Sequence, residues 1–364
     1  MRFPEFGEGW ASYKISDILR IGNGKDYKHL NKGNIPVFGT GGQMTSVNEY
    51  LYDGETTFIG RKGTINKPFY YNGKFWTVDT LFYTHSFKTV TPKFIYCLFQ
   101  TINWLRYNEA SGVPSLSKDT IEKIKVNIPC IEEQKKISRL LFAIDERIAT
   151  QNKIIEDLKK LKSAIVEMLL CNQSGESFKL GDVGCFVRGL TYANEDVTED
   201  KAATIVIRAN NLNYGSYVDK GEVVYVNKTP TVSQILRKGD IVICMANGSS
   251  ALVGKNSYYP FNDRQSTIGA FCGIYRTSNH IVKWLMQSQR YKKQVYQSLQ
   301  GGNGAIANLN GDDILNMSFP LIEKEKSQSI IFTIEAIEKS LAVNKCLHRL
   351  YCTQKSYLLK QMFI

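Results

Sequence analysis

The sequence predicts a mixed α+β protein (mixed α/β) of two globular domains and two long helices, which pair as an antiparallel coiled coil. Two observations carry this prediction. First, residues 130–173 and 321–364, 44 in each segment, contain neither glycine nor proline. Second, short motifs recur in the same order in both halves of the chain, as a pseudo-twofold repeat requires. Residues 1–129 and 174–320 then form the globular domains.

The globular segments carry the pattern of short strands joined by turns. The runs TTFI (56–59) and DIVICMA (240–246) are rich in β-branched and apolar residues and lie beside Gly, Asn or Asp. That composition is typical of strands and their bounding turns. Helical patterns at 92–106 and 280–297 precede the glycine-free segments. Each domain is therefore expected to pack helices on strands.

Four motif pairs identify the internal repeat. Each pair preserves residue character more than identity, and the four occur in one order. The pairs are YKISDI (13–18) with FKLGDV (178–183), DGETTFIGRKG (53–63) with KGDIVICMANG (238–248), LSKD (116–119) with LNGD (309–312), and NIPCIEEQKKI (127–137) with SFPLIEKEKSQSI (318–330). In the last pair, aligning the Ile-Glu dipeptides places Lys324-Glu325 opposite Glu133-Gln134.

The glycine-free segments each carry an apolar seam at heptad spacing, which favours a long helix with a helical partner. Eight of ten seam positions between 137 and 169 are apolar, and a shift of 193 residues gives seven of ten in the second segment. The seam positions singled out are Ile137, Leu141, Ile144, Ile148, Gln151, Ile155, Leu158, Ile334, Ile337, Leu341, Asn344 and His348.

Polar residues interrupt both seams at matching positions. Gln151 corresponds to Asn344 and Lys162 to Lys355. A lone polar seam residue can fix register and orientation, whereas the long lysine stems are expected to snorkel to water at the seam edge. An antiparallel pair centred near residue 153 predicts that Gln151 lies beside His348.

Composition limits the function classes. The net charge of +12 favours a polyanionic partner. No apolar run approaches the ~20 residues of a membrane span, and the first residues lack signal-peptide features, so a cytoplasmic location is expected. The eight cysteines form no C-x-x-C pair and the four histidines are scattered. Reduced thiols are therefore expected, with no metal site and no catalytic histidine.

Taken together, these motifs resemble the specificity subunit of Type I restriction-modification systems. The resemblance rests on RFPEFGEGWASYKISDI (2–18), SGVPSLSKDTIEKIKVNIP (111–129) running into IEEQKKISRLLFAIDERI (131–148), and LKKLKSAIVEMLL (158–170). FGTGG (38–42) and the stretch 58–85 look like one class of the family's target recognition domains. The implied order is target recognition domain 1 at 1–129, a spacer helix at 130–173, target recognition domain 2 at 174–320 and a second spacer helix at 321–364.

The resemblance implies a DNA-binding scaffold without chemistry of its own. Each recognition domain would read one half of a bipartite site in double-stranded DNA, while the helices set the spacing and dock two modification (methyltransferase) subunits. Those partners would bind S-adenosylmethionine, and restriction/translocase subunits can join. No cofactor is expected in this chain.

Candidate DNA contacts are basic, amide, hydroxyl and aromatic side chains in the loops between strands, because these groups bind phosphates and base edges. In the first domain they are Tyr27, Lys28, Arg61, Lys62, Lys67 and Trp76. In the second they are Arg188, Tyr192, Arg208, Asn210, Asn211, Tyr214, Asn247, Ser249, Arg264 and Gln265. The structural alternative for each is an ordinary solvated loop residue.

Other function classes fit less well. GSSALVGKN (248–256) departs from a P-loop in spacing, and Asn256 stands where a magnesium-binding Ser or Thr would be. An adenine methyltransferase would need an NPPY-type tetrapeptide, and none occurs. A two-domain coiled-coil adaptor that binds protein instead of DNA remains open, since aromatic content cannot separate the two kinds of ligand.

Overall fold

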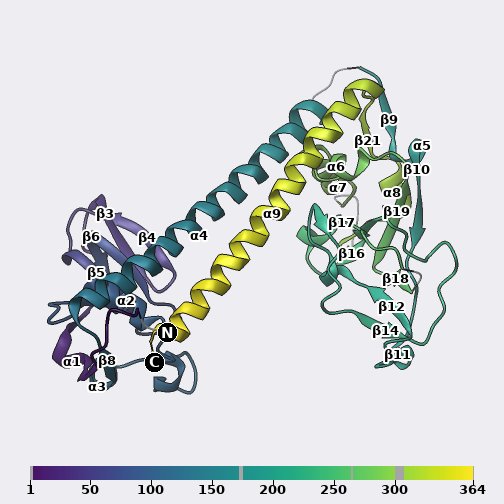
Figure 1. Ribbon diagram of the computed structural model, residues 1–364. Coiled ribbons are helices and arrows are strands. Elements are labelled where there is room, and N and C mark those ends of the chain that lie inside the picture. Colours follow the sequence, from purple (N-terminus) through teal and green to yellow (C-terminus); the bar gives the residue numbers. More distant parts are fainter. Residues whose placement is uncertain (1–2, 172–174, 264, 300–306, 364) are drawn as a thin grey trace. The chain divides into compact units, whose positions relative to one another are not determined.

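The computed structural model describes residues 3–171, 175–263, 265–299 and 307–363. The chain divides into two compact units, which are described separately (Figure 1). Unit 1 comprises Met1–Ile154 and Asn344–Ile364, and unit 2 comprises Ile155–Val343. Helices α4 (Ile131–Ile165) and α9 (Lys324–Met362) each contribute one stretch to each unit. The mixed α+β class is confirmed.

Unit 1 is organised around a six-stranded sheet of order β2-β7-β5-β6-β3-β4. Its strands are β2 (Arg20–Asn23), β3 (Lys32–Gly39), β4 (Gly42–Val47), β5 (Tyr52–Gly60), β6 (Phe69–Thr77) and β7 (Leu81–His85). Only the β3 and β6 neighbours run parallel. A smaller pair, β1 (Ala11–Lys14) with β8 (Lys125–Ile128), lies beside the short helices α1 (Ile15–Ile18) and α3 (Lys118–Lys123).

The main core of unit 1 extends from the domain into both long helices. Helix α2 (Pro92–Phe99) buries Phe94, Ile95 and Phe99 against it. The same cluster takes in seam residues Ile137, Leu141 and Ile144 of α4 together with Leu358 and Met362 of α9. The helix ends are therefore part of the domain's folding core.

Unit 2 contains a five-stranded sheet, β10-β19-β15-β17-β13, and a four-stranded sheet, β11-β14-β12-β18. The strands are β9 (Ser177–Lys179), β10 (Gly184–Arg188), β11 (Val197–Thr198), β12 (Thr204–Ile207), β13 (Ser216–Tyr217), β14 (Val224–Val226), β15 (Ile241–Cys244), β16 (Ala246–Asn247), β17 (Asn256–Tyr258), β18 (Ser266–Ile268), β19 (Cys272–Thr277), β20 (Ala307–Asn308) and β21 (Ser318–Pro320). Two further pairs join β16 to β20 and β9 to β21.

The helices of unit 2 tie its larger core to the helical pair. They are α5 (Leu180–Val183), α6 (Val282–Leu285), α7 (Gln289–Leu299), α8 (Gly311–Leu315) and a π-helical turn, Val166–Cys171, that follows α4. Buried residues of this turn, Val166 and Leu170, share a cluster with Trp284 of α6 and with Ile330 and Ile334 of α9. Both units thus anchor the long helices in the same way.

The repeat predicted from the motifs is confirmed at the level of hydrogen bonds. In YKISDI the Lys14 N–H donates to Asp17 Oδ2 at 2.9 Å. In FKLGDV the Lys179 N–H donates to Asp182 Oδ2 at 2.7 Å. Each bond caps a four-residue helix that directly follows a short strand. The two motifs therefore encode the same strand-to-helix turn.

The motifs LSKD and LNGD likewise both begin a helix. Ser117 caps α3 by accepting the Thr120 N–H at 3.1 Å, and Asn310 caps α8 by accepting the Asp313 N–H at 2.8 Å. Ser and Asn are favoured N-caps because their side-chain oxygens reach an unpaired backbone N–H. Each short helix leads into the strand that precedes a long helix.

Within each unit the stretches of α4 and α9 lie side by side and antiparallel (Figure 1). In unit 1, the partners met along α4 run backwards along α9, from Asp145 with Lys355 to Gln151 with Asn344. In unit 2, Ile155 packs in a cluster with Ile337 and Leu341 of α9. Ile148 and Leu158 are half-buried. This is the predicted antiparallel pairing.

Lys162 and Lys355 do not snorkel to water as the sequence suggested. Each lysine side chain is only 13% exposed and forms an ion pair: Lys162 Nζ lies 2.7 Å from Glu338, and Lys355 Nζ lies 2.5 Å from Asp145. The shift of 193 residues converts one pair into the other. Burial alone would raise the pKa of Glu338, but Lys162, Trp284 and Lys283 outweigh it and hold that pKa below its usual value.

The hydrogen-bonding partner of Gln151 is Asn344, one helical turn before His348, which the sequence predicted beside it. Gln151 is buried and donates its amide N–H to Asn344, whereas the half-buried His348 lies near Cys352 one turn further along α9. A buried amide needs a hydrogen-bonding partner, and Asn344 supplies it. The two repeat-related polar seam residues therefore pair with each other.

The alignment of the two junctions also needs correction. Helix α4 begins two residues after Pro129, while α9 begins four residues after Pro320. Gln134 therefore corresponds to Ser327 instead of Glu325, as the matching backbone bonds Gln134 N–H to Cys130 O and Ser327 N–H to Glu323 O indicate. The second junction carries two extra residues before its helix.

Candidate nucleic-acid interface

The predicted contact loops of the two domains are held by equivalent backbone bonds. After β5, the N–H groups of Arg61 and Lys62 both donate to Thr80 O, at 2.8 and 3.2 Å. After β15, the N–H groups of Met245 and Ala246 both donate to the carbonyl oxygen of residue 271, a phenylalanine, at 2.8 and 3.3 Å. Each loop is thus fixed to the turn that precedes the next strand of its sheet.

The same loops are also bonded to the segment before the junction. Leu116 N–H donates to Arg61 O, and Leu309 N–H donates to Met245 O, both at 2.8 Å. Lys62 forms a β-bridge with Ser115, and β16 pairs with β20 at the corresponding place. We call this shared arrangement of bonded turns the loop frame.

A glycine closes the loop frame in each domain. A Cβ at Gly24 would lie 1.9 Å from Val78 O, and one at Gly189 would lie 2.1 Å from Gly269 O. Their neighbours Lys25 and Leu190 donate to Thr77 O and Ile268 O, both at 2.8 Å. Any side chain at either glycine would collide with backbone, so the close approach requires glycine.

In unit 1 the lysine candidates are exposed at the loop frame or in neighbouring loops. Lys28, Lys62 and Lys67 are exposed, as phosphate contacts need to be. Arg61 is half-buried, donates from Nη1 to Asp79 O at 3.2 Å and lies over the Phe82 ring. Tyr27 is half-buried in a small apolar cluster. The lysines are therefore better placed for DNA than Arg61 or Tyr27.

Trp76 and Asn211 are structural side chains, contrary to the prediction. Trp76 is 6% exposed and its indole N–H donates to Lys25 O at 2.9 Å. Asn211 is 2% exposed, donates to Asp219 O and Glu222 O, and accepts the Arg208 N–H. Both use their polar atoms to hold loops, so neither can offer them to DNA.

Four of the predicted contacts of unit 2 line one pocket of about 450 Å³ at its loop frame. They are Tyr192, Arg208, Asn210 and Asn247. Arg208 and Asn210 are exposed, and Asn247 Oδ1 accepts the Ser249 N–H at 3.0 Å. Phe271 lines the same pocket and was missed because one exposed phenylalanine leaves no mark in a sequence pattern.

The other predicted contacts of unit 2 do not line this pocket. Arg188, Ser249 and Gln265 are exposed, and Arg264 lies outside the described residues. Tyr214 is 40% exposed, and its ring centre lies 4.8 Å from Lys292 Nζ. Asn256, the odd residue of the P-loop-like stretch, is buried and donates to Met286 O. The Asn256 side chain is therefore a structural group that fixes the backbone at Met286.

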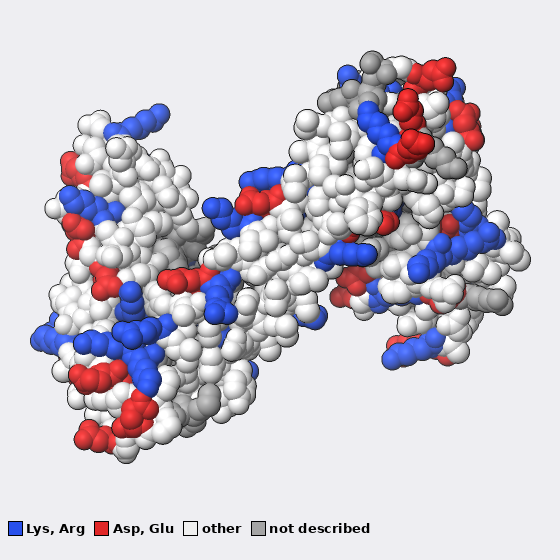
Figure 2. Space-filling view, turned by 45° about the horizontal axis from the view of Figure 1, so that its top comes forward, with Lys and Arg blue, Asp and Glu red and all other residues white. Residues whose placement is uncertain are grey.

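Charge is distributed over both units. Figure 2 shows Lys and Arg side chains on the visible face of each unit, interspersed with Asp, Glu and uncharged side chains. Among the described residues no group of three or more His, Cys, Asp or Glu could hold a metal ion. In the same part of the chain, no helix is long and apolar enough to cross a membrane.

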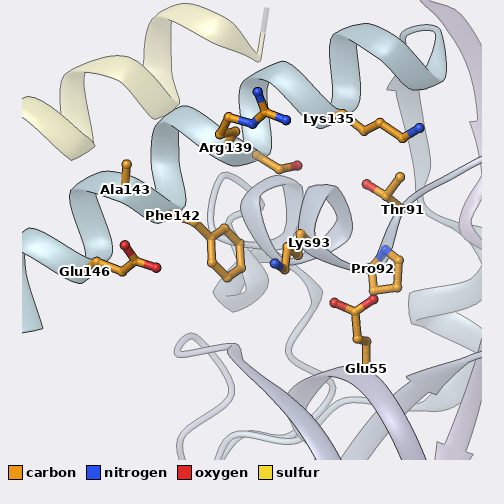
Figure 3. A pocket seen from close by; sticks show the side chains of 10 residues that line it. Glu55, Thr91, Pro92, Lys93, Lys135, Arg139, Phe142, Ala143 and Glu146 are labelled. Carbon is orange, nitrogen blue, oxygen red and sulfur yellow. The ribbon is translucent and has the colours of Figure 1, made fainter.

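A second cavity, of about 470 Å³, lies in unit 1 between α4 and the start of α2. Lys93 Nζ lies 5.3 Å from the centre of the Phe142 ring. Figure 3 shows these two side chains facing each other, with the Glu55 carboxylate directed into the same space. None of the predicted DNA contacts lines this cavity, so it is separate from the candidate interface.

Two repeat-related domains, each with a loop frame of different side chains and each built onto paired helices, define a two-part recognition scaffold. This arrangement is similar to that of the specificity subunits of Type I restriction-modification systems. Residues 7–160 match the family described as the Type I restriction modification DNA specificity domain.

Curated relatives are similar to this chain over different spans. The specificity subunit of the Type I restriction enzyme MjaVIII from Methanocaldococcus jannaschii is 24% identical across 93% of this chain and 81% of its own length. That of EcoKI from Escherichia coli K12 is 31% identical across 40% of this chain and 32% of its own length.

Solved structures share the fold. The S subunit of a Type I restriction-modification system from M. genitalium has a TM-score of 0.67 at 13% identity, covering 100% of this chain and 99% of the other. A structure described as showing the assembly and conformational transition of the Type I system has a TM-score of 0.56 at 12% identity, with 99% of both chains covered.

Proposed function

We propose that this protein reads a bipartite DNA site as the specificity subunit of a Type I restriction-modification complex, one domain on each half-site. The observation that carries the proposal is the loop frame. Its backbone bonds are repeated in both domains, whereas its side chains differ, with Lys62 in the first domain and Ala246 in the second. The same backbone frame with two different sets of side chains is suited to bind two DNA half-sites of different sequence.

The exposed side chains divide into phosphate and base contacts. Lys28, Lys62 and Lys67 in unit 1 suit phosphates, because an ammonium group is a point charge without base preference. In the pocket of unit 2, Arg208 suits a guanine edge and Asn247 an adenine edge. Sequence discrimination in the second half-site is therefore assigned to the pocket.

The paired helices act in this proposal as the spacer between the half-sites. Helices of 35 and 39 residues are about 53 and 58 Å long at ~1.5 Å per residue. One turn of duplex advances roughly 34 Å, so either helix exceeds one turn. The repeat also offers near-equivalent surfaces on which two identical modification subunits can dock.

Catalysis belongs to the partners in this proposal. The relatives in the comparison are named as specificity subunits, not as methyltransferases or nucleases. We assign adenine methylation to the docked modification subunits, which would bind S-adenosylmethionine, and cleavage to restriction/translocase subunits that can join the complex. The chain itself contributes recognition and spacing.

Salt dependence of duplex binding tests the proposal against the protein-binding adaptor. Affinity should fall steeply as salt rises, because each neutralised phosphate releases counterions. Lys62→Ala should lower affinity a few-fold and reduce the log–log salt slope by about 0.9, the value for one phosphate contact. Lys160→Ala, an exposed lysine on α4, is the matched control and should leave both unchanged. A wild-type affinity that does not respond to salt would favour the adaptor.

A further inference from the structure

Phe271 is the most exposed aromatic side chain at the loop frame of unit 2. It occupies the turn between β18 and β19 and is 70% exposed. A single exposed apolar residue is common and by itself carries no meaning. The backbone that holds Phe271 and the side chains around it supply the reason to assign it a role.

The turn that carries Phe271 is rigid. The Phe271 carbonyl accepts the N–H groups of Met245 and Ala246, and the Cys272 N–H donates to Gly269 O at 2.9 Å. Gly269 in turn donates to Ile207 O at 3.0 Å, which ties the turn to the neighbouring strand β12. A ring presented on such a turn loses little conformational freedom when it binds a ligand.

The surroundings of Phe271 match a nucleobase. The ring lines the pocket of about 450 Å³ together with Tyr192, Arg208, Asn210 and Asn247. Arg and Asn provide the donors and acceptors that read base edges, while an aromatic ring supplies an apolar surface for a base edge such as the thymine methyl. The pocket therefore offers both kinds of group that base recognition uses.

The first domain places a different residue on the same turn. Thr80 O accepts the Arg61 and Lys62 N–H groups in unit 1, as Phe271 O accepts two N–H groups in unit 2. The Leu81 N–H donates to Val78 O at 3.0 Å, which matches the bond from Cys272 to Gly269. Positions 80 and 271 are therefore equivalent points of the two loop frames, with a small hydroxyl in one and a large ring in the other.

We propose that Phe271 packs on a base of the second half-site and helps to determine its sequence, with Thr80 at the corresponding position for the first half-site. This inference rests on the proposed function, and it identifies Phe271 as a residue that distinguishes between bases in the second half-site. Because the Phe271 ring is uncharged, it neutralises no phosphate. Its removal should therefore leave the salt dependence of DNA binding unchanged.

The test compares duplex binding by the full chain with Phe271→Ala, Phe271→Trp and the control Phe332→Ala, whose side chain is 76% exposed on α9. Phe271→Ala should lose about tenfold or more in affinity for the cognate duplex, which is the scale of one disrupted base-pair contact. Its salt slope and thermal unfolding should not change. Phe271→Trp should recover most of the affinity, and Phe332→Ala should match wild type.

Base substitution in the duplex localises the effect. The discrimination lost in Phe271→Ala should be confined to base pairs of one half-site. Wild-type affinity of Phe271→Ala, a changed salt slope, reduced thermal stability or equal loss at both half-sites would each overturn the inference. If the wild-type chain binds duplex with a steep salt dependence while Phe271→Ala is unaffected, the proposed function stands and only this inference falls.

Discussion

The two domains build the same backbone and fill it with different chemistry. In unit 2, Arg276 of β19 pairs with the buried Asp240 at 2.7 Å, and that carboxylate also accepts the Arg237 N–H. At the matching strand position of unit 1 stands His85, whose pKa is lowered by burial and by Lys118 and Arg20. Backbone bonds therefore define the loop frame, while the side chains inside it and at its tip can differ.

Breaking the Asp240–Arg276 pair of unit 2, whose counterpart position in unit 1 holds His85, should have the strongest effect. Asp240→Asn should destabilise unit 2 by roughly 3 kcal/mol, because it leaves the guanidinium of Arg276 without its charged partner in a largely buried place. Peptide-resolved hydrogen exchange should show the loss in unit 2 and leave the domain of unit 1 unchanged.

The control for that change is an exposed ion pair. Glu156→Gln removes the partner of Lys159, with both side chains more than half exposed, and should cost under about 0.5 kcal/mol. An Asp240→Asn variant as stable as the control would mean that the buried pair does not distinguish the two domains.

The loop frame common to both domains is tested at its two glycines, Gly24 and Gly189. Gly24→Ala and Gly189→Ala should each destabilise their own unit by about 1–3 kcal/mol, because a Cβ would press on backbone carbonyls that cannot move aside. Gly41→Ala and Gly248→Ala, where a Cβ meets nothing within 4 Å, are the controls. Chemical denaturation of each variant measures the cost, and a large loss at only one of the two glycines would contradict equivalent frames.

The smallest effect is an acid sensitivity expected of unit 2. Burial opposes ionisation of Asp263, but hydrogen bonds from Lys220, Tyr259 and Ser266 lower its pKa to about 2. A depressed carboxyl pKa stabilises the folded state above the unfolded value of ~3.9, and that contribution is lost as pH falls towards 2.

Asp263→Asn should remove this contribution, so that unit 2 loses less stability between pH 4 and 2 than wild type does. The variant should also be less stable than wild type at neutral pH. Thermal unfolding across that range checks the expectation. Parallel pH profiles for the two proteins would show that Asp263 is not the titrating group.

Much of this architecture could be predicted from the sequence because it depends on local rules. Glycine-free heptads predict long helices, and capping residues such as Ser117 and Asn310 mark where short ones begin. The pairing of Gln151 with Asn344 could not be predicted, since the heptad pattern places helix faces together but does not say which polar side chains reach each other. The two extra residues before α9 were not predicted, because aligning the Ile-Glu dipeptides of the two junctions hides the insertion.

The candidate site was less accessible to sequence reasoning. Loop polarity identified Arg208 and Asn247, which do share a pocket. Loop polarity could not distinguish these two residues from Asn211, whose amide N–H groups donate to the carbonyls of Asp219 and Glu222. Nor could it find Phe271, because exposure of an apolar residue depends on tertiary placement and not on the local pattern.

The central claim is that two equivalent frames read two different half-sites independently. Its most direct test is co-expression of the chain with a modification subunit, followed by genome-wide mapping of methylated adenines in wild type, Lys62→Ala and Phe271→Ala. We expect a bipartite methylation motif in wild type. Phe271→Ala should relax the sequence of one half only, and Lys62→Ala should lower the methylated fraction of sites without changing the recognised sequence. A continuous motif, or relaxation of both halves by Phe271→Ala, would contradict the central claim.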